Sequence, residues 1–384
     1  MKNLAAALLA TALFVLPVWA VESSAADAAA GMSAVDAAAA VLMEKETGTI
    51  LYEQNSHDKL EPASVTKVMT LLLVLEAVDD GRLALDDMVS VSAHAASMGG
   101  SQVYLKEGEQ MSVDDMLKAV AVVSGNDAAV ALAEHLAGSE ESFVALMNQR
   151  ATKLGMADTC FVNCTGLPAA GHLTSAHDIA VMSRALLQHP RIRDYTTIWM
   201  DSIRDGQFQL ANTNKLIRFY EGATGLKTGS TDSAGYCLSA SAEREGMELI
   251  AVVLKADTSD IRFESAKSLL NYGFANYTLT DVYPSQALPP VDVLLGEDDT
   301  VQPVLAQSSR ILVDKSQLNE VTTELHLCEN VEAPVEEGQK LGEMVVYVGG
   351  QEQQSIPIVA DQAVERLTLP GIFSKFLKTL FMAG

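Results

Sequence analysis

Hydrophobic and polar positions divide the chain into a first part with helical and strand-like spacing and a second part with short alternating runs. Apolar residues at helical spacing predict helices over residues 65–78, 113–123, 128–137, 140–154, 175–187 and 259–272. Alternating or continuously apolar runs predict strands over residues 38–43, 49–53, 103–110, 236–242 and 249–255. Because strands stand at both ends of this part with helices between them, we expect a mixed α/β domain of the α+β type, with helices on an antiparallel sheet.

The second part begins near residue 276, where the pattern changes. The prolines Pro284, Pro289 and Pro290 mark a linker. Short alternating runs then predict strands over residues 291–295, 310–313, 323–327, 344–348 and 355–359. Residues 276–366 are therefore expected to form a small all-β domain. It shows no catalytic signature, so we expect residues 27–275 to carry any activity.

Residues 1–26 have the pattern of a secretory signal peptide. Lys2 precedes an apolar run over residues 4–16, and small residues follow from Ala20 onward. The run is short and Pro17 interrupts it, which argues against an uncleaved membrane anchor. We therefore expect the protein to be exported and to work outside the cytoplasm.

Residues 367–384 contain a short amphipathic segment. A helix over residues 372–381 would place three phenylalanines on one face and Lys375 and Lys378 on the other. This segment is too short to cross a bilayer, which needs about 20 apolar residues. It predicts a helix that lies at the outer face of the cytoplasmic membrane, with its lysines near anionic head groups. The alternative is a helix that docks on the protein's own surface.

Charge and cysteine usage remove several classes of function. The net charge of −24 argues against a nucleic-acid partner, because no basic patch is present. No spacing of cysteine and histidine resembles a metal site, and we expect neither a metal nor a cofactor. We expect the cysteines to be buried free thiols, although export permits disulfides and the Cys160–Cys164 pair stays open. The four cysteines are Cys160, Cys164, Cys237 and Cys328.

Ser64 and Lys67 form a Ser-x-x-Lys motif at the start of the predicted helix over residues 65–78. Residues three apart share a helix face, so the Lys67 amine is expected beside the Ser64 hydroxyl. A hydroxyl needs a neighbouring base to become a nucleophile, and lysine serves only if burial or a nearby cation lowers its pKa. The simpler interpretation of such a serine is a helix cap.

A second Ser-x-x-Lys sequence shows that this motif alone is not specific. Ser56 to Lys59 lies in a polar run without an apolar helix after it, and we interpret it as a loop. Its adjacent serine, histidine and aspartate do not make a triad, because a triad is a spatial arrangement. The interpretation of Ser64 therefore depends on further motifs.

Two later motifs support a catalytic role for Ser64. Ser124-Gly125-Asn126 forms a tight turn between two predicted helices, and Lys227-Thr228-Gly229 precedes the predicted strand over residues 236–242. Penicillin-binding proteins and class A β-lactamases carry three motifs in this order: Ser-x-x-Lys, Ser-Asp-Asn and Lys-Thr-Gly. Three ordered motifs in suitable local structure are a strong signal.

The chain resembles the low-molecular-mass penicillin-binding proteins, which are serine-type D-Ala-D-Ala carboxypeptidases. Beyond the three motifs, the resemblance covers residues 227–236, 166–168 and 175–180, within a similarity from about Ala37 to about Phe274. It implies a β-lactamase/transpeptidase-like fold and removal of the terminal D-alanine from peptidoglycan stem peptides. It also implies covalent binding of β-lactam antibiotics.

The resemblance implies a role for each residue of the first two motifs. Ser64 attacks the carbonyl of the penultimate D-alanine, and Lys67 takes the proton of the Ser64 hydroxyl. Ser124 relays a proton to the leaving amine. Asn126 holds a substrate amide and bonds Lys67.

The resemblance also implies that the third motif binds substrate along the edge of a strand. Lys227 supplies a positive field that keeps Lys67 neutral, and Thr228 bonds the substrate carboxylate. Gly229 has no side chain, so substrate can lie along the strand. The backbone N–H groups of Ser64 and Ser230 form the oxyanion hole.

Several alternatives to a carboxypeptidase share parts of this chemistry. Against a β-lactamase, Gly125 stands where class A enzymes carry aspartate, and no Glu-x-x-Leu-Asn segment occurs between Asn126 and Lys227. A penicillin-binding sensor needs a spanning helix, and no 18-residue apolar run follows residue 26. The sequence does not distinguish a carboxypeptidase from an endopeptidase that acts on cross-links. Arg262 is a weaker candidate for reading the carboxylate, since an arginine at a helix start is commonly a surface charge.

Overall fold

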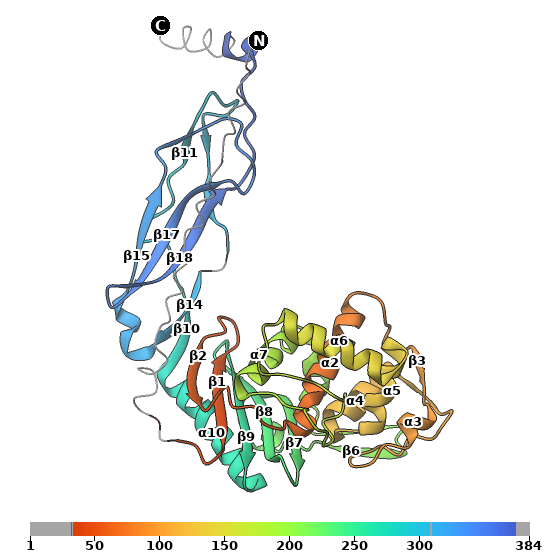
Figure 1. Cartoon of the computed structure of the whole chain (residues 1–384). Coiled ribbons are helices and arrows are strands. Elements are labelled where there is room, and N and C mark those ends of the chain that lie inside the picture. Colours follow the sequence, from red (N-terminus) through yellow and green to blue (C-terminus); the bar gives the residue numbers. More distant parts are fainter. Residues whose placement is uncertain (1–31, 33, 308, 374–384) are drawn as a thin grey trace, which may run out of the picture.

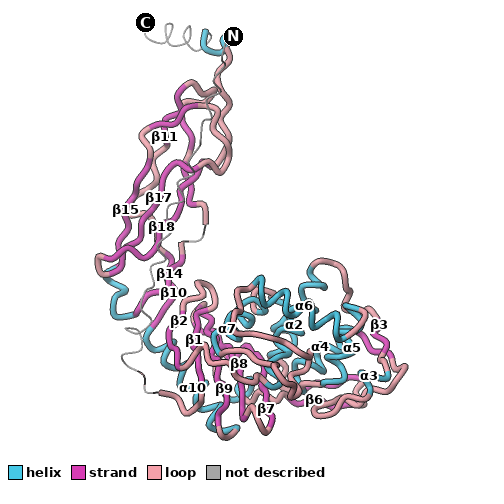
Figure 2. The backbone as a smooth tube through the Cα atoms, viewed as in Figure 1, coloured by secondary structure: helices cyan, strands magenta, loops and turns pink. Residues whose placement is uncertain are grey.

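The computed structural model describes residues 32, 34–307 and 309–373. These residues form a domain of helices around one sheet, from which an elongated β region projects (Figure 1). Helices are concentrated in the first domain, and strands and loops dominate the projecting region (Figure 2). The mixed first domain and the all-β second region confirm the predicted fold class.

The sheet of the first domain is antiparallel, with its five strands in the order β2-β1-β9-β8-β7. The strands are β1 (Ala39–Glu44), β2 (Ile50–Gln54), β7 (Ala223–Thr231), β8 (Gly235–Arg244) and β9 (Met247–Ala256). The predicted strands over residues 38–43 and 49–53 are confirmed and form a hairpin, and the predicted strand over residues 249–255 is also confirmed. The Lys-Thr-Gly motif was expected to precede a strand, whereas it lies within β7, at one edge of the sheet.

Helices cover both faces of this sheet. Helix α10 (Ser259–Asn276) packs on one face, and α2 (Lys67–Asp79) and α7 (Ala176–Leu186) lie on the other. Alternate residues of β9 therefore enter different cores: Ile250 packs with α7, and Leu249 packs with α10. A strand buried on both faces is continuously apolar, which explains the pattern that predicted β9.

The other long helices follow their predicted ranges. They are α4 (Val113–Val123), α5 (Asn126–Ala137) and α6 (Glu140–Lys153). The side chains of Ser112 and Ser139 accept a backbone N–H at the starts of α4 and α6, which fixes these helix boundaries. Shorter elements of this domain are η1 (Ala63–Thr66), β3 (Met88–Ser90), α3 (Ala93–Ala96), β4 (Gln110–Ser112), η2 (Pro190–Ile192), α8 (Arg193–Thr196), β5 (Met200–Ile203), β6 (Phe208–Ala211) and α9 (Leu216–Phe219).

The predicted strand over residues 103–110 is wrong for most of its length. Val103 and Leu105 are buried, as their apolar character suggested, but their N–H groups donate to a carboxylate instead of a neighbouring strand. Each of the two backbone nitrogens lies 3.0 Å from Oδ2 of buried Asp127. The carboxylate of Asp127, which is distant in sequence, thus accepts the backbone hydrogen bonds that the alternating pattern had assigned to a neighbouring strand.

The projecting region contains sheets of two, three and four strands. β10 (Tyr277–Asp281) pairs with β14 (Arg310–Asp314), and the larger sheets have the orders β12-β11-β16 and β13-β18-β17-β15. The prolines that predicted a linker lie between β10 and β11, and the five predicted strands of this region are confirmed. The remaining elements are β11 (Val291–Leu294), β12 (Thr300–Val301), β13 (Pro303–Leu305), η3 (Lys315–Glu320), β15 (Val321–Leu327), β16 (Asn330–Glu332), β17 (Lys340–Val348) and β18 (Gln351–Ala360).

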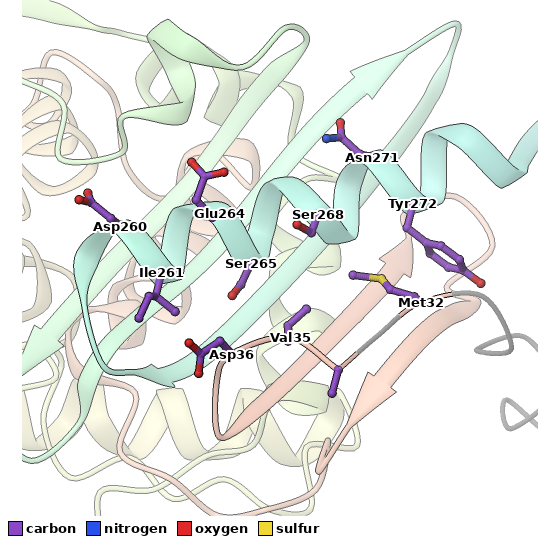
Figure 3. Close-up of a pocket in the computed structure, with 11 residues that line it drawn as sticks. Met32, Val35, Asp36, Asp260, Ile261, Glu264, Ser265, Ser268, Asn271 and Tyr272 are labelled. Atoms are coloured by element: carbon purple, nitrogen blue, oxygen red, sulfur yellow. The ribbon is translucent and has the colours of Figure 1, made fainter.

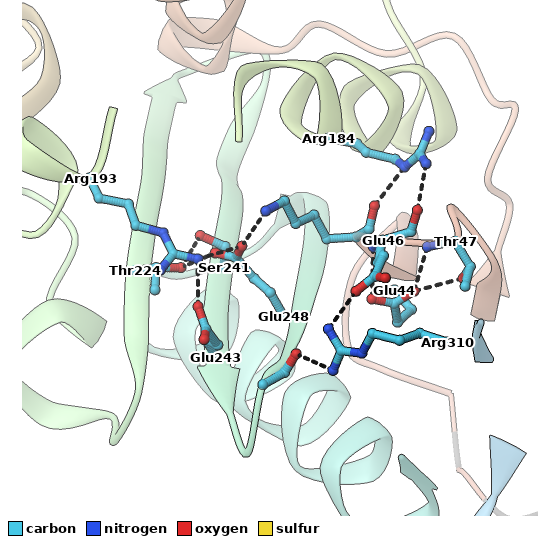
Figure 4. Close-up of polar contacts among 12 residues, drawn as sticks. Glu44, Glu46, Thr47, Arg184, Arg193, Thr224, Ser241, Glu243, Glu248 and Arg310 are labelled. Carbon is cyan, nitrogen blue, oxygen red and sulfur yellow. Dashed lines mark hydrogen bonds and ion pairs between the residues drawn. The ribbon is translucent and has the colours of Figure 1, made fainter. Parts of the chain in front are cut away.

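A polar network joins the projecting region to the sheet (Figure 4). Arg310 of β14 places Nη1 2.8 Å from Oε2 of Glu46, in the turn between β1 and β2. The neighbouring Lys45 pairs with buried Glu248 at 3.2 Å, and Glu248 Oε1 accepts a hydrogen bond from Thr224 Oγ1 of β7 at 2.7 Å. The contacts between the regions therefore continue into the strand that carries the Lys-Thr-Gly motif.

The cysteines and the chain ends differ in part from what the sequence predicted. All four cysteines are free thiols, so Cys160 and Cys164 do not form a disulfide. Cys160 and Cys328 are exposed, contrary to the expectation that all four are buried. The predicted signal peptide lies outside the described residues, as does the predicted tail helix beyond Phe373, although residues 369–373 are helical. Within the described ranges, no helix is long and apolar enough to cross a membrane.

Gly273 offers a test of how α10 packs on the sheet. A Cβ at this position would lie 2.5 Å from Cδ1 of Leu249 and 3.0 Å from Cδ2 of Leu42. We expect Gly273→Val to lower the free energy of unfolding by about 1–3 kcal/mol, because a packed core does not admit added volume without strain. Urea denaturation measures this change. Gly99→Ala is the control, since nothing lies within 4 Å of its Cβ position, and equal losses in both variants would contradict the packing.

Candidate active site

Ser64 lies on a tight turn that leads directly into α2. The turn is the 3₁₀ segment η1, and the preceding residue, Ala63, has a left-handed backbone with φ of +49°. This conformation costs roughly 1 kcal/mol or more for a residue with a Cβ, so the surroundings have to stabilise it. Lys67 Nζ lies 3.1 Å from Ser64 Oγ, which confirms that the motif brings these two groups together.

Lys67 is fully buried, and its amine is held by three oxygen atoms. Nζ donates to Oδ1 of Asn126 at 2.6 Å and to the carbonyl of Thr165 at 2.7 Å, and the third oxygen is Ser64 Oγ. Burial lowers the pKa of Lys67 to about 7, against smaller opposing effects of Cys164 and Asp127. A neutral amine has two N–H bonds and one lone pair. Asn126 and Thr165 take the two N–H bonds, which leaves the lone pair for the proton of Ser64.

Lys227 is the second buried lysine of the site, with an exposed fraction of 1%. Its Nζ donates to the carbonyl of Thr228 at 3.0 Å. Burial places the pKa of Lys227 well below its usual range, and the charges of Lys67 and Arg262 lower it further. The resemblance implied that the positive charge of Lys227 helps to keep Lys67 neutral. Burial is the main cause of the lowered pKa at Lys67.

Ser124 and Asn126 form the turn between α4 and α5 on the other side of Lys67. Ser124 ends α4 in the left-handed region, with φ of +64°. Its Oγ is buried and has no hydrogen-bond partner among the described residues, so it is available to a bound molecule. Asn126 bonds Lys67 as predicted, and its Nδ2 also donates to the carbonyl of Gly99 at 2.7 Å.

Strand β7 passes directly against the turn that carries Ser64. A Cβ on Gly229 would lie 2.8 Å from the Ser64 nitrogen and 2.9 Å from the Val65 nitrogen. Only glycine permits this approach of two backbones, whereas the sequence prediction attributed Gly229 to the passage of substrate. The neighbouring Ser230 is exposed. Because β7 packs against the Ser64 turn at Gly229, the two predicted oxyanion donors lie on adjacent backbone segments.

Thr228 and Arg262 occupy the two sides of the motif strand. Thr228 Oγ1 lies 2.7 Å from Oγ1 of Thr213, a residue that belongs to none of the motifs. Arg262 is buried, contrary to the interpretation of a surface charge, and Nη1 donates to the carbonyls of Gly229 and Cys237 at 3.2 Å each. Burial lowers the pKa of Arg262 to about 10, so the guanidinium keeps its charge at neutral pH.

The loop that follows α6 supplies groups that sequence reasoning missed. Thr165 contributes the carbonyl that accepts from Lys67, and buried His172 bonds Thr66. Gly166 is the residue of this loop that could have indicated its role. A Cβ on Gly166 would lie 1.8 Å from the carbonyl oxygen of Ala63, so only glycine permits the loop to approach the Ser64 turn. Gly166 and Gly229 therefore hold the Ser64 turn from two directions.

A cavity of about 790 Å³ lies away from this site, between residues 34–36 and α10 (Figure 3). The sheet separates this cavity from Ser64, because α10 and α2 lie on opposite faces. Within the described ranges, no three histidine, cysteine or carboxylate side chains are placed to hold a metal ion.

The geometry fits a serine acyl-transfer site, because a buried lysine amine lies beside a serine hydroxyl. The D-alanyl-D-alanine carboxypeptidase family matches residues 23–258, and the penicillin-binding protein 5 C-terminal domain matches residues 277–366. The chain belongs to the D-alanyl-D-alanine carboxypeptidase family and is a serine-type carboxypeptidase. The resemblance stated from the three motifs is thus confirmed.

Curated relatives and solved structures agree with this assignment. The chain is 42% identical to the D-alanyl-D-alanine carboxypeptidase DacF of Bacillus subtilis over 336 residues, which cover 86% of each chain. It is 36% identical to DacC of Escherichia coli, with 86% of this chain and 85% of DacC covered. Penicillin-binding protein 5 of Haemophilus influenzae superposes with a TM-score of 0.78 at 30% identity, covering 87% of this chain and 99% of that one.

The pKa of Lys67 predicts how activity depends on pH. Only the neutral amine can accept the Ser64 proton, so kcat/KM for release of D-alanine should rise with pH through about 7 and then level off. The measurement follows a peptide ending in D-Ala-D-Ala between about pH 5 and 9. Activity that still rises at the upper end of this range without levelling off, as expected for the ordinary lysine pKa of 10.5, or activity that does not rise at all, would exclude Lys67 as the base.

Proposed function

We propose that this carboxypeptidase removes the terminal D-alanine of peptidoglycan stem peptides through an acyl-enzyme on Ser64. The observation that carries the proposal is the 3.1 Å approach of Lys67 Nζ to Ser64 Oγ at a site where burial lowers the pKa of the amine to about 7. Such a lysine can remove a hydroxyl proton at neutral pH.

The reaction begins when Ser64 Oγ attacks the carbonyl carbon of the penultimate D-alanine and its proton passes to Lys67 Nζ. The backbone N–H groups of Ser64 and Ser230 stabilise the tetrahedral oxyanion. The peptide C–N bond then breaks, and the leaving amine takes a proton through Ser124, whose buried hydroxyl has no partner among the described residues. Water hydrolyses the resulting ester and returns Ser64 to its free form.

The remaining motif residues bind and orient the substrate. Thr228 bonds the terminal carboxylate, with Lys227 and Arg262 supplying positive charge nearby. Asn126 holds Lys67 and a substrate amide. The backbone of β7 runs beside the substrate because Gly229 lets this edge strand approach Ser64.

The same nucleophile is proposed to react with β-lactam antibiotics. Penicillin-binding protein D2 of Listeria monocytogenes has been solved in its ampicillin-bound form, and it matches 62% of this chain with a TM-score of 0.58 at 36% identity. A β-lactam carbonyl carries the same electrophilic carbon, so attack by Ser64 would leave a covalent acyl-enzyme. Since residues 126–227 lack the Glu-x-x-Leu-Asn segment of class A β-lactamases, fast hydrolysis of this adduct is not expected.

Removal of the nucleophile tests the proposed function. Ser64→Ala should abolish release of D-alanine and covalent labelling by a fluorescent penicillin, because Ser64 Oγ is the only hydroxyl among the described residues that lies within hydrogen-bond distance of Lys67 Nζ. Ser56→Ala is the matched control, since Ser56 Oγ donates to Glu53 instead of Lys67, and both signals should stay unchanged. Labelling that persists in Ser64→Ala would place the nucleophile elsewhere.

We further propose that the protein is exported and that its tail holds it at the outer face of the cytoplasmic membrane. Residues 27–275 would be the catalytic domain, and residues 276–366 would be a spacer between that domain and the membrane. Three observations support this arrangement: the signal-peptide pattern, the amphipathic sequence of residues 372–381, and the projection of the β region away from the catalytic domain (Figure 1). Leu369 and Phe373 are exposed, with 83% and 64% of their surfaces accessible.

Truncation after Leu369 tests the anchor. The shortened protein should lose binding to vesicles of anionic lipid, because the removed segment contains the phenylalanines and lysines of the amphipathic pattern. Release of D-alanine from a soluble peptide should survive, since none of the site residues lies in the tail. Equal vesicle binding by both forms, or no binding by either, would show that the tail is not an anchor.

A further inference from the structure

A chain of buried hydrogen bonds lies behind the Ser64 turn. His172, with an exposed fraction of 3%, accepts the N–H of Val162 at Nδ1, at a distance of 3.0 Å. Its Nε2 lies 2.8 Å from Oγ1 of Thr66. Thr66 Oγ1 in turn donates to the carbonyl of Ala63 at 2.9 Å. The chain therefore runs from the loop after α6 to the residue that precedes the nucleophile.

The hydrogen-bond directions in this chain are fixed by chemistry. Because Nδ1 of His172 accepts a hydrogen bond, the ring carries its proton on Nε2, and this N–H donates to Thr66. The Thr66 hydroxyl then has its own proton free for Ala63. Burial lowers the pKa of His172 to about 4, so the ring is neutral at physiological pH, as this tautomer requires.

The end of the chain acts on the backbone of the nucleophile. The carbonyl of Ala63 and the N–H of Ser64 belong to the same rigid peptide group and point in opposite directions. Fixing the carbonyl therefore fixes the direction of the Ser64 N–H. Ala63 needs this support because its φ of +49° is strained, and the close packing of Gly166 on its carbonyl leaves little room for another orientation.

We propose that Thr66 and His172 are positioning residues that aim the backbone N–H of Ser64 at the oxyanion. This inference rests on the proposed acyl-enzyme at Ser64. Neither side chain touches the reacting atoms, and their effect passes through the Ala63–Ser64 peptide group. A misdirected N–H would weaken stabilisation of the transition state without changing the pocket that binds the ground state.

Valine and serine at position 66 separate this role from core packing. Thr66→Val keeps the shape of the side chain and removes the hydroxyl, and it should lower the rate constant of acylation by a fluorescent penicillin by about tenfold or more. The dissociation constant of the non-covalent complex should change by less than about twofold, since only the transition state uses the oxyanion. Thr66→Ser keeps the hydroxyl and should restore acylation.

His172 provides a second, independent variant. His172→Phe fills the same space without ring nitrogens and should slow acylation in the same way. If both residues act through one chain, the double variant Thr66→Val/His172→Phe should be no slower than the poorer single variant, beyond about twofold. Thr196→Val is the matched control: this buried hydroxyl also donates to a carbonyl, that of Thr224 at 2.7 Å, and its loss should leave acylation unchanged.

The outcomes distinguish the two proposals. Wild-type protein that is not labelled at all would overturn the acyl-enzyme, and the positioning role with it. Normal labelling of the wild type together with a normal acylation rate in folded Thr66→Val or His172→Phe would overturn the positioning role alone. The positioning role is also overturned if Thr66→Ser is as slow as Thr66→Val, or if the losses in the double variant are additive.

Discussion

The burial of one lysine amine is the constraint on which the site depends. Lys67 lies at the base of α2, enclosed by the sheet, the α4–α5 turn and the loop that supplies Thr165. In water this amine would hold its proton and could not serve as a base. Exclusion of water changes that balance, and two fixed oxygens orient the amine so that its lone pair meets Ser64. Unpaired polar groups are costly where water is excluded, which explains why all three oxygens around Nζ lie within hydrogen-bond distance of it.

The site is assembled by close contacts between backbones. Gly229 brings β7 against the Ser64 turn, and Gly166 brings the loop after α6 against Ala63. A side chain at either glycine would separate elements whose N–H and carbonyl groups are needed at short range. The unfavourable φ of Ala63 is therefore held by the packing of three segments that are far apart in sequence.

The division of the sheet into two buried faces positions these segments. The core around α2 and α7 supports the catalytic side, and α10 closes the other side. β7 is an edge strand, and at Gly229 it packs directly against the Ser64 turn. Arg262 reaches from α10 to the carbonyl of Gly229, so the far helix also contributes to the order of this edge.

The sequence by itself determined the helices, the N-terminal hairpin, the strands of the second region and the three motifs, because these depend on local periodicity and short spacings. It placed Ser64 beside Lys67 through helix geometry alone. It failed over residues 103–110, where Asp127 replaces a strand partner, and for Arg262 and His172, whose burial depends on distant elements. Only the tertiary structure decided the low pKa of Lys67 and the glycine contacts. Dielectric environment and backbone approach are properties of how separate segments meet, and no single segment encodes them.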